Sequence, residues 1–458
     1  LSSLQLLALA VNSLSGPIPS EIGSLTRLGL LSLALNQLTG ILPIDALCTL
    51  VQPRTPDPTI ELTNFTNLEL PTNHLEGSIP NCLFQSNSSL ISIFLSNNML
   101  TGNIYSLSTD NHLNIETTDS IAHLDLSDNH FTGYMPVILA KWNKLVILNI
   151  SYNNIGDRMI ISSNLTELMF YDISNNVLSG TISREVVNMH LLYELIISNN
   201  LISGTIPTEV GDIPGIYNFY VLDFGYNMIS GTIPTTMAVL TSVTTFLVGT
   251  NYLHGTISNQ FTNPDSNMQI LDLSNNGFTG SIPTEIFTLP LLLAVSLSQN
   301  CFTGSIPESI CESSSLQVLD MDGLSTADDC TFTTPIMKDL AVMLHNTQVY
   351  RAKYLDGGLP QCIFQMSNLS SIYMAGNGLI GTLPSLDPTS NLETISLSHN
   401  RFYGQIPQSM QTWSKMISLD LSFNRLSGTV NNMNYSAKMV IVPSSSTSPS
   451  GTDTDTDS

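Results

Sequence analysis

MQILDLSNNGFTGSIP, residues 268–283, is the stretch that decides the fold, because the chain repeats it. Similar stretches begin at Leu292 (LLAVSLSQNCFTGSIP), at Leu192 (LYELIISNNLISGTIP) and, more loosely, at Leu369 (LSSIYMAGNGLIGTLP). The shared template is L-x-x-L-x-L-x-x-N-x-L-[ST]-G-x-I-P. Places in this template are counted from its first Leu, so that the Asn stands at place 9.

One asparagine per copy sets the period of the repeat. Ten of the fourteen intervals between successive members are 23 to 25 residues long, which is typical of a leucine-rich repeat. The predicted fold class is an α/β repeat: a leucine-rich-repeat solenoid, curved as a right-handed superhelix, with a parallel β-sheet on the concave face and short 3-10 or α turns on the convex face. The asparagines are Asn12, Asn36, Asn73, Asn98, Asn129, Asn153, Asn176, Asn200, Asn227, Asn251, Asn276, Asn300, Asn377, Asn400 and Asn424.

Each part of the template has a physical role. The L-x-L core alternates inward and outward as a short strand does, and its leucines stack on those of neighbouring turns. Each turn buries about three or four aliphatic side chains, each contributing about 1.5–3 kcal/mol, and no turn can bury that face alone. The Asn amide satisfies backbone groups that the bend leaves unpaired, so the Asn column predicts structure and not a binding site. Gly permits a close turn, and Pro ends the second extended stretch.

The G-x-I-P half of the template resembles the plant-type subclass of leucine-rich repeats over about residues 1–430. That subclass occurs in receptor-like kinase ectodomains, receptor-like proteins and polygalacturonase-inhibiting proteins. Leu316–Cys330 and the following Gly358–Cys362 are similar to repeats in diatom surface proteins of this class. The resemblance implies a recognition module, with any kinase domain outside this chain.

Composition excludes several classes of partner. The net charge of −23 argues against nucleic acid, which needs a basic surface, and disfavours anionic membrane surfaces. No apolar run approaches the roughly 18 residues of a membrane span, so a membrane is expected only through flanking segments. The chain starts at Leu1, inside a repeat and without a cap, and we expect it to be a fragment.

The repeats are expected to form one domain of residues 1–430, with about 17 turns and an irregular island at 322–356. At the island, Leu324 stands where the template has Asn, and a helix is expected to begin near Thr334. Residues 431–458 are of low complexity and are predicted to be a linker or tail.

Six cysteines without a C-x-x-C pair indicate disulfides and not zinc. Cys48 and Cys82 flank an insertion, and a bridge between them would close it. Cys311, Cys330 and Cys362 lie around the island, so at least one disulfide involving Cys330 is expected to tie it. Glycosylation candidates are Asn64, Asn87, Asn164, Asn368 and Asn434.

The sequon at Asn149 differs from the other five. It lies at place 5, where a glycan would block the concave face, and it is therefore left out of the candidates. Disulfides and sequons together favour an extracellular or cell-surface setting.

Unusual residues on the concave side mark the candidate binding site. Places 3, 5, 7 and 8 are expected to face this side, and Asp at place 5 and Ser at place 7 are the usual fillers. Aromatic side chains break that rule, and exposed aromatic residues dominate interface energetics. These candidates are Phe94, Tyr152, Phe170, Tyr226, Tyr373 and Phe423.

The island adds a second candidate region, because Tyr350, Arg351, Lys353 and Tyr354 place two cations beside two aromatic rings. In receptors that this family resembles, such interruptions often build the ligand pocket; the alternative is a solvated loop. Asp320 and Asp322 are candidates for Ca²⁺ through hard carboxylates, against the alternative of an irregular turn. No catalytic constellation is present, and neither a cofactor nor a resident metal is predicted.

A rival function follows from the flank of the repeats. The residues before and after the template Gly share a face, and if the turns stack in register they form a two-column hydroxyl array that can order water. The pairs are Ser179/Thr181, Ser203/Thr205, Ser230/Thr232, His254/Thr256, Thr279/Ser281 and Thr303/Ser305.

The sequence therefore predicts a ligand-recognition module of a receptor-like or cell-surface protein, which binds a protein, peptide or polysaccharide non-covalently and is not an enzyme. Two alternatives stay open: a secreted inhibitor similar to polygalacturonase inhibitors, and an ice-binding protein that uses the Ser/Thr array. Flanking gene sequence separates receptor from inhibitor, and a thermal-hysteresis assay tests ice binding.

Overall fold

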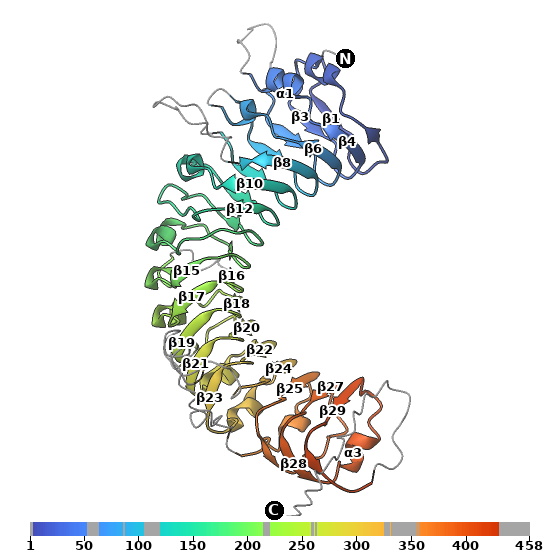
Figure 1. Cartoon of the computed structure of the whole chain (residues 1–458), viewed down its shortest axis with the longest axis vertical. Helices are drawn as coiled ribbons and strands as arrows, with labels where there is room; N and C mark the ends of the chain where they lie inside the picture. The colour runs from blue at the N-terminus through green and yellow to red at the C-terminus, as the bar shows by residue number, and fades with distance from the viewer. Residues whose placement is uncertain are drawn as a thin grey trace, which may run out of the picture. The chain divides into compact units, whose positions relative to one another are not determined.

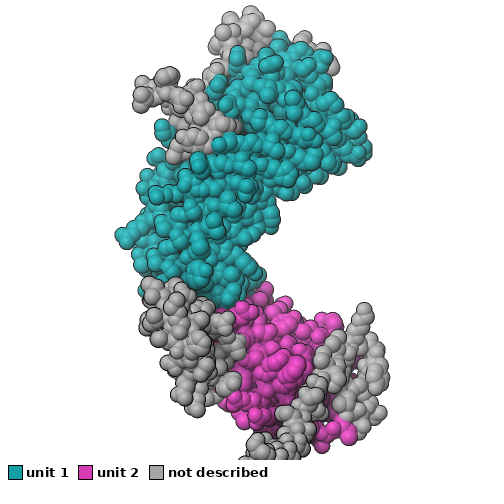
Figure 2. All heavy atoms as spheres, viewed as in Figure 1, with its two compact units in different colours: residues 1–278, 288–292 teal, residues 279–287, 293–458 magenta. Residues whose placement is uncertain are grey.

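The computed structural model describes residues 3–52, 64–85, 88–104, 120–213, 220–257, 261, 263–324, 330, 355 and 357–429. The chain divides into two compact units, the first of residues 1–278 with 288–292 and the second of residues 279–287 with 293–458 (Figure 2). In each unit a regular turn runs through a main strand, a bend at the template Asn, a second short strand and a 3-10 turn (Figure 1). The predicted leucine-rich-repeat architecture is thereby confirmed.

Main strands form a parallel sheet. Their order is β1-β3-β5-β7-β9-β11-β13-β14-β16-β18-β20 in the first unit and β22-β24-β25-β27-β29 in the second. The strands are β1 Leu6–Ala8, β3 Leu30–Ser32, β5 Asn67–Glu69, β7 Ser92–Phe94, β9 His123–Asp125, β11 Ile147–Asn149, β13 Phe170–Asp172, β14 Glu194–Ile196, β16 Val221–Asp223, β18 Thr245–Leu247, β20 Ile270–Asp272, β22 Ala294–Ser296, β24 Val318–Asp320, β25 Ser371–Tyr373, β27 Thr394–Ser396 and β29 Ser418–Asp420.

The pairing of main strands is in register, and it sets which side chains are exposed. Leu195 in the middle of β14 pairs with Tyr171 of β13 and Leu222 of β16, and all three side chains are buried. The residues on either side of Leu195, Glu194 and Ile196, are half-exposed. Places 3 and 5 thus point to one side of the sheet, which we call the strand face, as the alternation in the sequence predicts.

Each template Asn joins two turns. Asn200, only 7% exposed, donates from Nδ2 to Ile173 O of the preceding turn at 3.0 Å and accepts from Leu178 N, also of that turn, at 3.0 Å. The same Nδ2 lies 3.2 Å from the carbonyl oxygens of Ile197 and Ser198 in its own turn. The side chain therefore satisfies backbone groups on both sides of the bend, which confirms its predicted structural role.

Second strands and short helices complete each turn. The template Pro is the N-cap of η1, η2, η4, η6, η7 and η9; it follows Ile in each of these turns except that of η4, where it follows Met135. The second strands are β2 Ser15–Gly16, β4 Gln37–Ile41, β6 His74–Gly77, β8 Met99–Asn103, β10 His130–Tyr134, β12 Asn154–Gly156, β15 Ser203–Thr205, β17 Met228–Gly231, β19 Tyr252–Thr256, β21 Gly277–Ser281, β23 Cys301–Thr303, β26 Ile380–Gly381, β28 Arg401–Gly404 and β30 Arg425–Leu426. The helices are η1 Ser20–Ser24, α1 Ile44–Val51, η2 Asn81–Phe84, η4 Val137–Lys141, η5 Arg184–Asn188, η6 Thr208–Val210, η7 Thr235–Val239, η8 Thr284–Thr288, η9 Glu308–Glu312, η10 Ile363–Gln365 and α3 Gln408–Gln411.

The second strands do not stack in register, so the prediction of a two-column hydroxyl array is wrong. Thr205 lies opposite Ser230, and Thr181 lies opposite Ser203. The residue after Gly in one turn thus lies beside the residue before Gly in the next turn. The reason is that neighbouring second strands are shifted by two template places, whereas neighbouring main strands pair at the same places. The columns are therefore slanted, which removes the geometric basis for the ice-binding alternative.

The long departure from the template leaves the main sheet continuous within the second unit. β24 pairs with β25 residue for residue, and Leu324 N donates to Asn377 Oδ1, 53 residues further along the chain, at 2.7 Å. Leu324 stands at place 9, and the buried Leu355 stands at place 11 of the same turn. In the sequence, residues 325–354 therefore stand between places 9 and 11, where a regular turn has a single residue.

Three disulfides join the cysteines. Cys48, in α1, pairs with Cys82, in η2, as the sequence suggests for this insertion. Cys330 pairs with Cys301, which sequence reasoning did not include among the candidates, and Cys311 pairs with Cys362. The Cys301–Cys330 bridge ties the preceding turn to the departure, and the Cys311–Cys362 bridge ties that turn to the chain after the departure. Within the part of the chain that the structure describes, no helix is both long enough and apolar enough to cross a membrane.

Candidate ligand-binding face

Hydrogen bonds join place 5 to place 7 on the strand face. Asp172 Oδ1 accepts from Ser174 N at 2.9 Å, and Asp223 Oδ1 accepts from Gly225 N at 3.0 Å. Ser198 Oγ also donates to Asp223 Oδ2 of the next turn, at 2.7 Å. Each carboxylate therefore closes a local bend, which explains why the repeat prefers Asp at place 5.

Asparagine performs the same task at one turn. Asn149 Oδ1 accepts from Ser151 N at 3.1 Å and from Ser151 Oγ at 2.7 Å. A negative charge at place 5 is thus not needed to close the bend, since a neutral amide oxygen is sufficient.

Three carboxylates of adjacent turns have raised pKa values. Burial is the main cause for Asp172, Glu194 and Asp223. Hydrogen bonds from Ser174 and Ser198 act in the opposite direction on Asp172 and Asp223, respectively, while the negative charge of Asp172 raises the pKa of Glu194 further. The strand face therefore holds partly desolvated charges that repel one another.

The aromatic residues predicted at places 3 and 5 all lie on this face. Phe94 is half-exposed and stacks on His123 with ring centroids 6.1 Å apart, and Phe170 and Tyr373 are also half-exposed. His123 Nδ1 lies 2.9 Å from Ser92 Oγ, but Ser92 is only 3% exposed, so this pair packs and does not present a nucleophile. Burial lowers the pKa of His123, which favours the neutral form of the ring.

Place 8 has left-handed backbone in every described turn, including those that carry the three aromatic residues predicted there. Tyr152, Tyr226 and Phe423 have φ values of 52°, 52° and 54° and are 60%, 64% and 53% exposed. Left-handed backbone favours Gly or Asn and costs other residues about 1–2 kcal/mol. Phe423 also stacks on His399, with ring centroids 4.1 Å apart. Bulky exposed rings at this place do not serve the fold, so we count them with the candidate binding residues.

Sequence reasoning missed two aromatic residues at place 2. Tyr193 contacts Phe170 with centroids 5.3 Å apart and Tyr220 with centroids 4.5 Å apart. The three rings therefore form a row across adjacent turns, and all three are half-exposed. Place 2 directly follows a buried leucine, and only places 3, 5, 7 and 8 were assigned to the face; a search of place 2 for aromatic residues would have found the row.

The remaining candidates fall in different environments. Tyr350, Arg351, Lys353 and Tyr354 lie outside the described residues, as do Asn87, Asn434 and the helix expected near Thr334. The sequon asparagines Asn64, Asn164 and Asn368 are exposed, whereas Asn149 is half-exposed on the strand face.

The calcium candidates are engaged in hydrogen bonds within the protein. Asp320 Oδ2 accepts from Ser296 Oγ at 2.6 Å and from Ser298 Oγ at 2.8 Å. Asp322 Oδ1 accepts from Ala375 N. In the described ranges, the one group with metal-ligating spacing is Glu308, Cys311 and Cys362, whose two cysteines are joined as a disulfide.

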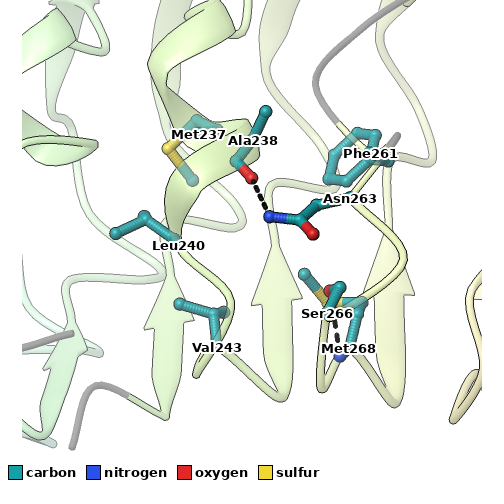
Figure 3. Close-up of a pocket in the computed structure, with 8 residues that line it drawn as sticks. All are labelled: Met237, Ala238, Leu240, Val243, Phe261, Asn263, Ser266 and Met268. Atoms are coloured by element: carbon teal, nitrogen blue, oxygen red, sulfur yellow. Dashed lines mark hydrogen bonds between the residues drawn. The ribbon is translucent and has the colours of Figure 1, made fainter. Parts of the chain in front are cut away.

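A small pocket lies on the 3-10 side of the first unit, away from the strand face. Asn263 Nδ2 donates across it to Ala238 O at 3.2 Å (Figure 3). Its cavity is about 10 Å³, room for one water molecule at most, so it does not hold a ligand. The lining residues are Met237, Ala238, Leu240, Val243, Phe261, Asn263, Ser266 and Met268.

Comparison with known proteins agrees with this architecture. The family profile described as Leucine Rich Repeat matches residues 120–142, 267–289 and 391–413, and a second such profile matches residues 143–158. The repeats are leucine-rich repeats. Receptor-like protein 32 of Arabidopsis thaliana is 29% identical over 224 residues, which are 48% of this chain and 24% of that protein. The chain thus spans about a quarter of the length of this curated relative.

Several of the solved structures that are similar to this chain are plant receptors. The ectodomain of the membrane receptor kinase GASSHO1/SCHENGEN3 of Arabidopsis thaliana, in complex with CASPARIAN STRIP INTEGRITY FACTOR 2, has a TM-score of 0.72 and 27% identity, covering 93% of this chain and 48% of that one. The plant peptide hormone receptor RGFR1, in complex with RGF2, has a TM-score of 0.69 and 26% identity, covering 96% and 74%. The leucine-rich-repeat chain is thus similar to receptor-like proteins in sequence and to receptor ectodomains in fold.

Proposed function

We propose that this chain is the extracellular ligand-recognition module of a receptor-like leucine-rich-repeat protein, and that it binds a peptide or protein non-covalently on its strand face. The observation that carries the proposal is the presence of exposed aromatic side chains at places of the strand face where most turns carry smaller residues. Tyr152 and Tyr226 are exposed and hold left-handed backbone that asparagine adopts more easily. A cost to folding at an exposed position is typical of a residue kept for binding.

Three further observations support the proposal. Three disulfides and exposed sequons favour a location at the cell surface or outside the cell. The similar ectodomains named above were solved as complexes with partners of their own. The binding residues proposed on the strand face supply contact area and hydrogen bonds, and their role is to hold a ligand without chemical change.

The repeat itself provides a way to test the face. Asp172→Asn turns Asp172-Ile173-Ser174 into an N-glycosylation sequon, and Asn149 shows that an amide at place 5 preserves the bend. Made in an Asn149→Asp background, which removes the native sequon at place 5 of the adjacent turn, and secreted from a glycosylating host, this variant should carry a glycan on the strand face and should lose binding to peptides selected by display against the Asn149→Asp chain. Enzymatic removal with peptide:N-glycosidase F converts the glycosylated Asn to Asp and should restore binding fully.

A matched control places a glycan on the opposite side of the same region. His190→Thr creates a sequon at Asn188, in η5, and should leave binding unchanged. Retained binding with a confirmed glycan at position 172 would contradict the proposal. Equal loss of binding in both variants would show that any glycan interferes, and would equally remove the support for the strand face.

A further inference from the structure

An aromatic row borders the strand face at β13, β14 and β16. Phe170 begins β13, Tyr193 immediately precedes β14, and Tyr220 immediately precedes β16. Centroid separations of 5.3 Å and 4.5 Å make the three rings one continuous surface, and each ring is half-exposed. Such a row offers flat apolar area and π faces to a partner.

Carboxylates lie directly beside this row. The register places Asp172 and Asp223 on either side of Ile196, about 10 Å apart across two strand spacings. Glu194 is two residues before Ile196 in β14 and points to the same face. Three carboxylates therefore surround the half-exposed Ile196.

No positive charge on this face balances them. Places 2 to 8 of the described turns in the first unit contain no Lys or Arg, but they contain seven carboxylates: Glu69, Asp125, Asp128, Asp172, Glu194, Asp223 and Asp272. Among the described residues, neither Asp172, Glu194 nor Asp223 forms an ion pair. The raised pKa values of these three groups have burial as their main cause and the charge of a nearby carboxylate as a smaller one: Asp223 for Asp172, Asp172 for Glu194, and Asp272 for Asp223. A cation would relieve the repulsion.

We propose that the aromatic–acidic surface, defined as Phe170, Asp172, Tyr193, Glu194, Tyr220 and Asp223, docks an extended cationic segment of a polypeptide. An arginine fits best: its apolar stem covers Ile196, and its guanidinium group lies among the carboxylates and against an aromatic face. This inference rests on the proposed function and names the chemistry of its ligand.

Charge complementarity decides between a cationic polypeptide and a neutral glycan. Aromatic rows bind sugars as well as peptides, but a neutral sugar would leave the three carboxylates desolvated and repelling one another. A cationic side chain uses the rings and the carboxylates together, and it is therefore the occupant that this surface favours.

The test uses a fluorescein-labelled peptide with arginine at every second position in a serine background, which puts its cations on one side of an extended chain. The full chain and a triple variant, Asp172→Asn with Glu194→Gln and Asp223→Asn, are produced in a bacterial periplasmic host, since the first substitution creates a sequon. Fluorescence anisotropy at about 150 mM salt measures affinity. We expect at least about a tenfold loss in the variant, equivalent to about 1.4 kcal/mol.

A second triple variant controls for net charge. Asp125→Asn, Asp128→Asn and Asp272→Asn also remove three charges from the strand face, but none of these residues belongs to the aromatic–acidic surface. We expect this control to weaken binding less than about twofold, because Asp125 and Asp272 lie two strand spacings outside Asp172 and Asp223, about 10 Å, which exceeds the screening length of about 8 Å at this salt concentration. Tyr193→Leu combined with Tyr220→Leu should weaken the arginine peptide as well, because leucine keeps the apolar volume but lacks the π face.

Several outcomes would overturn the inference. Equal losses in the two triple variants would indicate diffuse attraction to an acidic protein. Unchanged binding of a peptide with citrulline, the neutral isostere, in place of arginine would exclude charge recognition. Binding of cellohexaose that depends on Tyr193, without binding of the arginine peptide, would identify a glycan surface. If the glycan at position 172 blocks binding of the selected peptides but the first triple variant binds the arginine peptide as the unmodified chain does, the proposed function stands and this inference fails.

Discussion

The uninterrupted stretch β13–β14–β16 and the interrupted stretch β24–β25 have the same sheet geometry but very different chain paths. Leu178 and Asn200, which share a hydrogen bond, are 22 residues apart, whereas Leu324 and Asn377 are 53 residues apart. Both pairs form a bond from a backbone N–H to Asn Oδ1, at 3.0 Å and 2.7 Å, although the donor stands at place 11 in the first pair and at place 9 in the second. A long insertion is therefore tolerated when the following turn keeps its Asn, since loop length adds little to the free energy of closure.

The largest expected effect comes from removing that Asn in either stretch. Asn200→Leu leaves Leu178 N without a partner and Ile173 O with only Asn176 Nδ2, and Asn377→Leu removes the partner of Leu324 N and of Met321 O. Each substitution should lower the free energy of local opening by about 3 kcal/mol, since each buried group left unpaired costs about 1–3 kcal/mol. Hydrogen exchange of backbone amides in the flanking strands measures this free energy of local opening. A negligible effect of Asn377→Leu alone would show that the insertion uncouples its neighbours.

The disulfide beside the insertion should have an effect of similar size, but only in the interrupted stretch. Cys301→Ser with Cys330→Ser opens a loop with a sequence separation of 29, for which loss of the cross-link costs about 2–4 kcal/mol. Exchange should accelerate in β24 and β25 but not in β14. The pair Cys48→Ser and Cys82→Ser, which opens a loop of separation 34 near α1, serves as the matched control. Faster exchange in β14 after the first change would contradict the locality that stacked repeats imply.

The pH dependence of stability should also differ between the two stretches, but by a smaller amount. Asp172, Glu194 and Asp223 have raised pKa values, so the folded state binds more protons than the unfolded state between the ordinary carboxyl pKa and the raised one. Stability of β13–β16 should therefore increase as the pH falls from 7 through the raised pKa values, and it should stop increasing below the ordinary pKa of about 4. The neutral triple variant, made in the periplasmic host, should flatten this dependence.

In the interrupted stretch, burial raises the pKa of Asp322, and the charge of Asp320 adds to the shift. Asp322→Asn should therefore remove a smaller part of the acid stabilisation than the triple variant does. Differential exchange at pH 7 and pH 5 reports the change for each strand. Stability of β13–β16 that falls on acidification to pH 5 would contradict the assignment of raised pKa values.

The smallest effect concerns place 8, where the two stretches differ in residue type. Tyr226 holds φ +52° in the uninterrupted stretch, while Gly376 holds φ +71° at the same place after β25. Tyr226→Asn should stabilise by about 0.5–1 kcal/mol, and Gly376→Tyr should destabilise by about 1 kcal/mol, because a side chain raises the energy of left-handed backbone. Thermal unfolding measures both. Destabilisation by Tyr226→Asn would mean that the exposed ring contributes packing that its 64% exposure does not suggest.

The sequence predicts most of this fold because each regular turn repeats the same local solution. The Asn period and the L-x-L alternation correctly give parallel strands, outward-facing Phe94 and Phe170, and the structural role of Asn200. The partner of Cys330 was not predicted, since nothing near Cys301 in the sequence shows that its turn lies against the insertion.

The candidate site was predicted less completely, because its contacts lie between turns and not within them. Tyr193, at place 2, contacts Phe170 at place 3 of the preceding turn and Tyr220 at place 2 of the following turn, and these contacts depend on how neighbouring turns pack. The in-register hydroxyl array failed for the same reason: Thr205 lies opposite Ser230, a shift of two places that no single repeat reveals.

Carboxyl footprinting tests the central claim, that ligand binds the strand face at β13–β16, most directly. The chain is labelled with carbodiimide and glycine ethyl ester, with and without a peptide selected by display, and each Asp and Glu is read by mass spectrometry. The account predicts that bound peptide lowers labelling of Asp172, Glu194 and Asp223, while Glu21 and Glu308 on the 3-10 side label as before. Saturating peptide that leaves Asp172, Glu194 and Asp223 fully labelled would contradict the account.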